Sequence, residues 1–348
     1  MASSGLRRRI GATAYPLYVV PHSHFDLIWR RPADWYRKRR AAIYRAALDL
    51  LEARPAFRYS FCQAMGLDVF FRDHPEQKAR FRRLLREGRL EIIGGPLTIP
   101  DVNLSSGEAI VRNQIMGRAW LARELGVDVD IACMEDAFGV PSSLPALLAS
   151  CGLPFYRASR MPRPGRPNLN GPFCWRGHDG TVVPAWGPEG MAWGLGQPSD
   201  IDAPPHDYEG MVAQYRRDLQ ACPWDGSRPV LFSLLGEEHI PGENNIAAFV
   251  EAAASLRIPF QWTTAREFVA ATRKSGALTR APLVRDDFSR LFTGCYSSRI
   301  HQKAMIALAE SDLLAAENVA AAAGRRRDAL DRGWSDLFLM QFHDAYGG

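Results

Sequence analysis

The sequence lacks a paired-cysteine pattern and lacks a long uninterrupted apolar run. Its six cysteines are scattered without a C-x-x-C spacing: Cys62, Cys133, Cys151, Cys174, Cys222 and Cys295. This distribution argues against a disulfide framework and favours reduced thiols in a cytoplasmic protein. No stretch reaches the ~18 apolar residues that a membrane span needs. The short apolar stretch near the N-terminus contains Pro16 and no small-residue cleavage site, so we expect neither a signal peptide nor a membrane partner.

The basic residues also lack an interleaved aromatic platform on which nucleic-acid bases could stack. The net charge of +5 comes mainly from arginine-rich stretches such as 37–40, 82–83 and 325–327. These stretches alternate with acidic and apolar residues, which is typical of a solvated helix face rather than a nucleic-acid patch. The chain has 348 residues, of which 47% are hydrophobic and 23% charged, as in an ordinary globular protein. We therefore expect no nucleic-acid partner.

Short apolar runs alternate with longer helical patterns over the first 290 residues. The expected strands are 17–20, 57–61, 90–93, 129–134, 154–156, 230–235 and 259–262. The expected helices lie near 34–53, 74–87, 107–125, 142–151, 208–220, 243–256 and 264–274. This alternation predicts an α/β fold with a mostly parallel sheet or barrel of about seven strand–helix units.

Two regions depart from this alternation. Segment 160–206 is rich in Pro, Gly, Trp and Asn, and we expect a long loop or an inserted hairpin around 174–175 and 182–186 that forms a wall of the site. Residues 300–323 are rich in Ala and Leu and predict one long helix. A second helix is expected after Gly324, with an apolar stripe formed by Leu330, Trp334, Phe338, Phe342 and Ala345. Two such helices without a third partner resemble an unfinished bundle.

Polar side chains that can bind a metal or transfer a proton follow three of the expected strands. His24 and Asp26 come after the first strand, Asp136 follows the strand at 129–134, and Glu237 and Glu238 follow the strand at 230–235. Residues just beyond the carboxyl ends of parallel strands converge on one crevice. His24 and Asp26 project to the same side of an extended segment, and imidazole with carboxylate suits Zn²⁺ or a similar ion. A His-x-Asp pair alone is equally compatible with an ordinary polar pair, and His22 with His24 also mimics the His-x-His of barrel metallohydrolases.

A fourth segment, Gln341-Phe342-His343-Asp344, lies on the last expected helix. A single helical histidine is usually structural. Here, however, His343 would supply the second nitrogen that the candidate metal site still lacks.

Taken together, these motifs resemble the N-terminal part of glycoside hydrolase family 38, the retaining α-mannosidases. His22-Ser23-His24-Phe25-Asp26 with Trp29 resembles the opening HSHxDxxW motif, and Glu135-Asp136-Ala137-Phe138-Gly139 resembles the D-x-F-G nucleophile segment. Segment 95–108 is similar to the loop before the nucleophile, and segments 293–298 and 341–344 resemble the later GxYxS and QxHD motifs. These ordered matches extend over essentially the whole chain.

The resemblance implies a seven-stranded, mostly parallel (β/α) barrel over residues 1–290. Residues 291–348 would then form a partial helical-bundle segment that carries the last metal ligand. It also implies Zn²⁺ as cofactor, with Co²⁺ or Mn²⁺ as alternatives, bound by the following residues: His24, Asp26, Asp136 and His343. The implied substrate is an α-mannoside or oligomannose.

The same resemblance assigns the chemistry to carboxylates. Asp136 is the expected nucleophile, and Glu238 is the expected general acid, although family members usually carry Asp there; Glu237 is the alternative. Trp29 is expected to stack on the apolar face of the sugar, unless it is an ordinary half-buried tryptophan.

Three weaker candidates complete the expected site. Asp101 and Asp344 could accept hydrogen bonds from substrate hydroxyls, and Arg157 could hold the Asp136 carboxylate. Structural salt bridges are the equally plausible reading for all three.

Two other functions compete with a mannosidase. The first is a truncated fragment that binds metal or sugar with little activity, with a homo-oligomer or a partner chain that completes the helical bundle. The second is a different metal-dependent hydrolase, such as a deacetylase-like barrel with a metal-activated water.

Overall fold

The computed structural model describes residues 15–161, 169–192, 195, 202–325 and 328–347. The N-terminal stretch considered for a signal peptide, parts of segment 160–206 and two of the arginines at 325–327 lie outside the described residues.

The larger sheet is built around β1 (Leu17–Ser23), whose seven residues are all buried. Its order is β3 (Leu90–Ile93), β2 (Tyr59–Cys62), β1, β9 (Val230–Leu235) and β8 (Gly190–Ala192). β10 (Phe260–Trp262) pairs with the first half of β1, whereas β2 pairs with its second half. Every one of these pairings is parallel. The carboxyl ends of the central strands therefore lie together at one edge of the sheet, where the candidate residues were expected.

The second sheet contains shorter strands and the expected hairpin. Its order is β11 (Leu283–Val284), β6 (Gly171–Arg176), β7 (Val182–Gly187), β5 (Tyr156–Arg157) and β4 (Ala132–Cys133). β6 and β7 form the antiparallel hairpin predicted within segment 160–206, and the other pairings are parallel. A backbone hydrogen bond of 2.8 Å, from the Gly94 N–H to the Ile131 carbonyl, links the β3 edge to the segment before β4.

The expected closed seven-stranded barrel is not confirmed, because the described strands form two separate sheets. The reason lies in strand length: β4 and β5 contain only two residues each, whereas six and three residues were expected at these places. Such short strands leave too few backbone groups to continue the ladder around a barrel.

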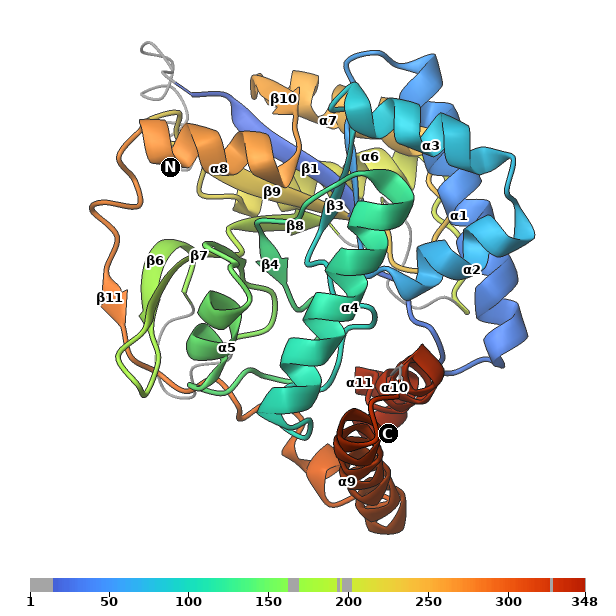
Figure 1. Cartoon of the computed structure of the whole chain (residues 1–348). Helices are drawn as coiled ribbons and strands as arrows, with labels where there is room; N and C mark the ends of the chain where they lie inside the picture. Colours follow the sequence, from blue (N-terminus) through green and yellow to red (C-terminus); the bar gives the residue numbers. More distant parts are fainter. Residues whose placement is uncertain (1–14, 162–168, 193–194, 196–201, 326–327, 348) are drawn as a thin grey trace.

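Helices surround the parallel sheet and pack against it (Figure 1). They follow the predicted ranges closely: α1 (Ala33–Ala53), α3 (Gln77–Arg86), α4 (Gly107–Leu125), α5 (Leu144–Ser150), α6 (Tyr208–Ala221), α7 (Glu243–Ser255) and α8 (Ala265–Lys274). α2 (Met65–Asp73), a short helix of nine residues, was not predicted. Caps explain several boundaries: Ser106 accepts a hydrogen bond from Ala109 at the start of α4, and Gly126 ends that helix at φ 71°. No described helix is long and apolar enough to span a bilayer.

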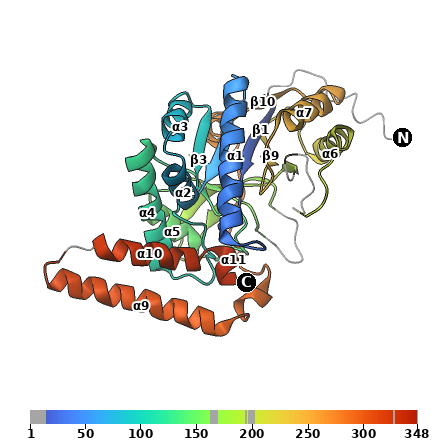
Figure 2. The ribbon, with the colours of Figure 1, turned by 90° about the vertical axis from the view of Figure 1, so that its right-hand side faces the viewer.

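The C-terminal helices run along one side of the molecule, beneath α4 and the lower end of α1 (Figure 2). They comprise α9 (Ile300–Ala322), α10 (Asp328–Met340) and α11 (His343–Gly347), preceded by the short 3₁₀ helix η2 (Thr293–Tyr296). Trp334 on α10 is buried, its indole N–H donates to Glu317 at 3.0 Å, and the Arg112 guanidinium of α4 lies 4.4 Å from its ring centre. These contacts fix the α9–α10 pair against α4.

The prediction of one continuous second helix through Ala345 is wrong, because the helix is interrupted at Gln341 and Phe342. The Asp101 N–H donates to the Gln341 carbonyl at 3.0 Å, and Phe342 forms an antiparallel bridge with Pro100. The loop at 100–101 thus takes backbone groups that a continuous helix would use. α11 consequently begins at His343.

Candidate active site

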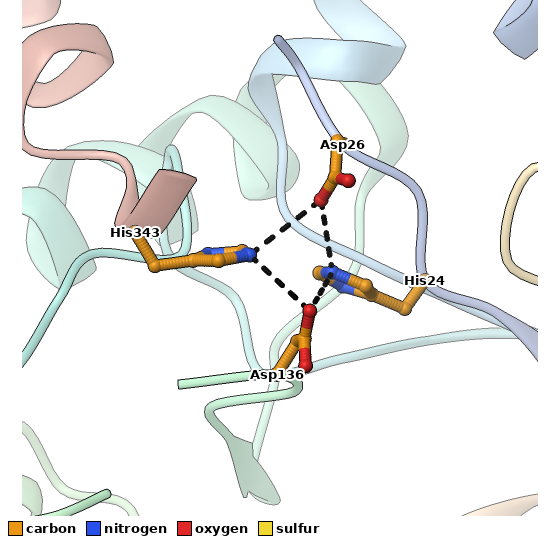
Figure 3. A group of neighbouring side chains, drawn as sticks. All are labelled: His24, Asp26, Asp136 and His343. Carbon is orange, nitrogen blue, oxygen red and sulfur yellow. Dashed lines mark ion pairs between the residues drawn. The ribbon is translucent and has the colours of Figure 1, made fainter. Parts of the chain in front are cut away.

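Four side chains from three distant parts of the chain converge at one point (Figure 3). His24 and Asp26 follow β1, Asp136 lies in the turn after β4, and His343 begins α11. One ligand atom from each residue lies within 4.8 Å of all the others.

The distances within this cluster suit a single small ion. The Asp26 Oδ1 atom lies 3.4 Å from the His24 Nε2 atom and 3.5 Å from the His343 Nε2 atom. The Asp136 Oδ2 atom lies 4.0 and 3.8 Å from the same two nitrogens. Donor atoms about 2.0–2.2 Å from a tetrahedral zinc ion lie roughly 3.3–3.6 Å apart. The observed spacing is therefore slightly wider than that of a closed zinc shell.

Three of the four facing atoms lack a hydrogen bond. Among the described residues, His24 Nε2, Asp26 Oδ1 and His343 Nε2 are buried and make no hydrogen bond. Leaving buried polar groups unpaired is costly, and a bound cation would satisfy all three at once. Two imidazole nitrogens and two carboxylates form a donor set that suits Zn²⁺ and similar divalent ions. The residues present therefore fit a metal.

In both imidazoles the Nδ1 atom, which faces away from the cluster, has a partner that fixes the ring orientation. The His343 Nδ1 atom lies 3.1 Å from the Ile99 carbonyl, which requires its proton on Nδ1 and leaves the Nε2 lone pair facing the cluster. The His24 Nδ1 atom lies 3.9 Å from the Cys62 sulfur, and that thiol can donate in turn to the Ser23 carbonyl at 3.7 Å. A carbonyl and a thiol thus select the tautomer that ligates metal through Nε2.

Charge coupling within the cluster is strong. Burial by itself lowers the pKa of His343, but Asp344, Asp26 and Asp136 outweigh burial and raise it to about 10. Burial favours the neutral form of Asp26, yet His24 and His343 hold its pKa well below the ordinary range. The two carboxylates therefore attract positive charge, and a divalent ion would replace the protons on the imidazoles.

The backbone holds Asp136 in an unusual conformation. Its φ is 59°, in the left-handed region, and its carboxylate forms an ion pair with Arg160. Three residues later Gly139 has φ 89°, and a Cβ there would lie 2.5 Å from the Phe288 carbonyl oxygen. The Asn103 side chain donates to the carbonyls of Phe138 and Gly139 at 3.2 and 3.3 Å. Tight turns of this kind at strand ends are typical of functional sites.

A cleft of about 490 Å³ opens directly onto the cluster. It is lined by His24, Asp26, Trp29, Asp136, Phe138, Arg160, Glu237, Glu238, Phe292 and Asp344. Trp29 is 50% exposed, and the Arg30 guanidinium lies 5.2 Å from its ring centre, which leaves part of the ring accessible to a ligand. Aromatic rings beside carboxylates and a cation site are a common lining for a carbohydrate.

The two glutamates after β9 lie in this cleft with raised pKa values. Burial, then Asp26 and Glu237, raise the pKa of Glu238 to about 8. Burial raises that of Glu237 to about 7; His24 opposes the rise and Asp136 adds to it. Asp344 also lines the cleft, and burial raises its pKa to about 6 against the opposing effect of His343. Of the three, Glu238 has a pKa above 7, and a carboxyl group that stays protonated at neutral pH can donate a proton.

Two expected site residues do not line the cleft. Arg157 is buried and forms an ion pair with Glu135, and it also donates to Ser233 at 2.8 Å. The carboxylate of Asp136 is held by Arg160 instead, because Arg157 points from β5 into the buried interior.

Asp101 is fully buried, and its Oδ1 atom accepts the N–H groups of Asn103 and Leu104 at 2.9 and 3.0 Å. Asp101 thus shapes the loop that carries Ile99 to His343.

Sequence reasoning missed Arg160, Phe138 and Phe292 as cleft residues. Only Phe138, inside the Asp-x-Phe-Gly pattern, carried a readable signal.

Comparison with known proteins shows what the chain is similar to. Residues 14–186 match the family described as glycosyl hydrolases family 38 N-terminal domain, and residues 290–348 match the alpha mannosidase middle domain. The chain is 23% identical to alpha-mannosidase G of Dictyostelium discoideum over 347 residues, which cover 95% of this chain and 30% of that protein. It is 26% identical to human alpha-mannosidase 2C1 over 200 residues, covering 56% of this chain and 19% of that protein.

The fold is also shared with a solved structure. An alpha-mannosidase from Enterococcus faecalis superposes with a TM-score of 0.78 at 22% identity, covering 95% of this chain and 39% of that one. The chain thus spans less than a third of the length of the two curated relatives. With both family matches in their expected order along the chain, this protein belongs to glycosyl hydrolase family 38.

Proposed function

We propose that the protein hydrolyses terminal α-mannosides with retention of configuration, using Zn²⁺ bound by His24, Asp26, Asp136 and His343. The observation that carries this proposal is the four-residue cluster, which opens onto a cleft containing two further carboxyl groups. The substrate would be an α-mannoside or oligomannose. Co²⁺ and Mn²⁺ are alternative ions for the same donors.

The bound ion would supply a Lewis acid that chelates the cis 2- and 3-hydroxyls of mannose. The chain's own residues position the sugar around that point. Trp29 would stack on its apolar face, and the Asp344 carboxylate would accept a hydroxyl hydrogen bond. The exposure of Trp29 and the place of Asp344 in the cleft support these roles.

Asp136 would act as the nucleophile. Its Oδ2 atom faces the two imidazoles, whereas its Oδ1 atom faces Arg160. The two oxygens can therefore divide the tasks of ligation and attack. A bond forms from the carboxylate to the anomeric carbon as the bond to the leaving oxygen breaks, which gives a glycosyl-enzyme.

Glu238 would protonate the leaving oxygen and then activate the water that hydrolyses the glycosyl-enzyme. Its raised pKa, about 8, supports a protonated carboxyl at neutral pH. Glu237 has a pKa of about 7 and remains the alternative acid.

These roles assign a separate function to each of the two proposed domains. Residues 1–290 would form the catalytic domain, and residues 291–348 would supply the last ligand, His343. The six cysteines are all unpaired, which supports the proposal of a reducing, cytoplasmic compartment.

The test combines metal analysis of the purified protein with hydrolysis of an aryl α-mannoside. We expect one bound metal ion per chain, activity that a chelator removes, and α-mannose as the first product by NMR. Asp136→Ala should abolish turnover, and a 5-fluoro mannosyl fluoride, which keeps both hydroxyls, should label Asp136 of the wild-type protein.

Metal without hydrolysis would instead favour a binding fragment. Hydrolysis of an acetylated sugar without glycosidic cleavage would favour a deacetylase-like enzyme.

A further inference from the structure

A second, larger groove of about 780 Å³ adjoins the cleft, and Trp29 and Asp344 line both. One wall of this groove is the first two turns of α1, and the opposite wall comes from the end of α10, from α11 and from the start of α9. These elements lie next to one another at the lower end of α1 (Figure 2). A molecule whose sugar occupies the cleft could therefore extend into the groove past Trp29.

The groove is rich in arginine. Arg30, Arg37, Arg40 and Arg299 line it, together with two aspartates. Arg30 pairs with Asp202 at 2.9 Å, and Arg37 pairs with Asp73 at 2.6 Å.

The two aspartates are also paired. Asp34 pairs with Lys38 at 2.7 Å, and Asp344 lies 3.3 Å from the His343 Nε2 atom. The charge of the groove therefore depends on the remaining two arginines.

Of these two arginines, Arg40 is unusual because it is buried. It is only 6% exposed, and within the part of the chain that the structure describes no carboxylate lies within 4.0 Å of its guanidinium. One terminal nitrogen donates to the carbonyls of Asp26 and Leu27 at 2.7 and 3.3 Å, and its buried Nε has no partner. A buried guanidinium without a counter-charge is costly, so this side of the groove favours an anion.

Arg299 supplies a second free charge. It is exposed at the residue before α9 and makes no ion pair with any described side chain. Arginine binds carboxylate and phosphate through a planar pair of donors, which makes it well suited to such a ligand.

The position of the proposed acid shows which part of a substrate would reach the groove. The Arg39 Nε–H of α1 donates to the Glu238 carbonyl at 2.6 Å, so the acid is tied to the helix that forms the groove wall. A general acid lies beside the leaving oxygen, and the aglycone continues from that oxygen. Glu238 lines the cleft, and Trp29 and Asp344 line both the cleft and the groove, so an aglycone that continues from the leaving oxygen can pass Trp29 into the groove.

We propose that this groove is an aglycone site for an anionic group, a carboxylate or a phosphate, carried by the leaving part of an α-mannoside. This inference rests on the proposed mannosidase function and specifies its substrate class. Arg299 and Arg40 are the residues that recognise the anion, and Trp29 separates it from the sugar.

The experiment compares three matched aryl α-mannosides: 4-carboxyphenyl, 4-phosphonophenyl and the neutral 4-carbamoylphenyl compound. The measurement is the ratio of kcat/KM for each anionic substrate to that for the neutral one. We expect both ratios to exceed one in the wild type, to fall with added salt, and to drop about tenfold in Arg299→Ala and further in Arg299→Glu. A larger ratio for one anion identifies which group the site takes.

Arg325→Ala is the matched control, because Arg325 is an exposed arginine at the other end of α9. It should leave both ratios unchanged. Arg40 is left intact, since it also holds the Asp26 carbonyl.

The outcomes separate the two proposals. Hydrolysis of all three substrates with ratios near one, insensitive to Arg299, would overturn the groove assignment while the mannosidase function stands. If no substrate is hydrolysed, calorimetric binding of the same compounds decides. Tighter binding of an anionic compound that depends on Arg299 supports the groove, and equal or absent binding overturns it.

Discussion

Glu91 offers a sharp test of how burial and charge determine the stability of this fold. It lies on β3, and its carboxylate accepts the N–H groups of Ala265 and Arg266 at 2.7 and 3.0 Å, at the start of α8. Ser60 donates to the same carboxylate at 3.2 Å. Burial nevertheless dominates and raises the pKa of Glu91 from 4.5 to about 7.

The sign and size of the effect follow from proton linkage. The folded carboxyl holds its proton more tightly than the unfolded one, so its contribution to stability is complete below pH 4.5 and is lost as the pH rises through 7. A rise of the pKa from 4.5 to about 7 corresponds to roughly 3 kcal/mol in total, most of which is lost between pH 5 and pH 8. Glutamine cannot ionise, so Glu91→Gln removes this dependence and leaves a constant offset from one altered hydrogen bond.

The assay is urea unfolding of both proteins at half-unit steps from pH 5 to pH 8, with the metal content held constant. The free energy of unfolding of the wild type should fall relative to that of Glu91→Gln by roughly 2–3 kcal/mol across this range. Two curves that stay parallel would refute the argument, because they would show that the cap bonds, rather than burial, control the Glu91 proton.

Further predictions concern the site. His343→Ala should lower metal affinity by more than about 100-fold, because it removes a ligand rather than a supporting group; His301→Ala, on the exposed start of α9, is the control in metal titrations. Arg160→Gln should lower kcat more than it changes KM, since the guanidinium pairs with Asp136, the proposed nucleophile, and an effect confined to KM would contradict this role. Glu238→Gln should remove the fall in activity above about pH 8 and slow poor leaving groups most, and a mutant with unchanged leaving-group dependence would transfer the role to Glu237. Gly139→Ala should destabilise the fold by about 2 kcal/mol, as measured by denaturant unfolding, because its Cβ would meet the Phe288 carbonyl.

Local patterns allowed much of the α/β layout to be predicted from sequence. β1 is an apolar run that ends in polar residues, and α4 lies between a serine cap and Gly126. The hairpin of β6 and β7 followed from its tryptophans and turn residues. In each case the signal lies within the element itself.

The failures have tertiary causes. The interruption at Gln341 depends on the loop at 100–101, which is remote in sequence. β4 is shorter than predicted, and the strands form two sheets instead of a closed barrel. Both features depend on contacts between the edges of the two sheets, which no local sequence pattern encodes. Arg160, rather than Arg157, faces Asp136 because the chain turns after β5. His343 was proposed to join the other three residues because the site lacked a second nitrogen ligand and because of a family resemblance, since spacing along the chain carries no such information.

The attachment of His343 has a consequence for biosynthesis. A nascent chain released from the ribosome in order would complete both sheets more than fifty residues before the last imidazole emerges. Until α10 docks and Phe342 bridges to Pro100, only three donors are in place, and the growing protein would hold an ion weakly. Tight metal capture would thus require that α10 and α11 have docked, so that loading with the ion follows the docking of these helices rather than preceding it.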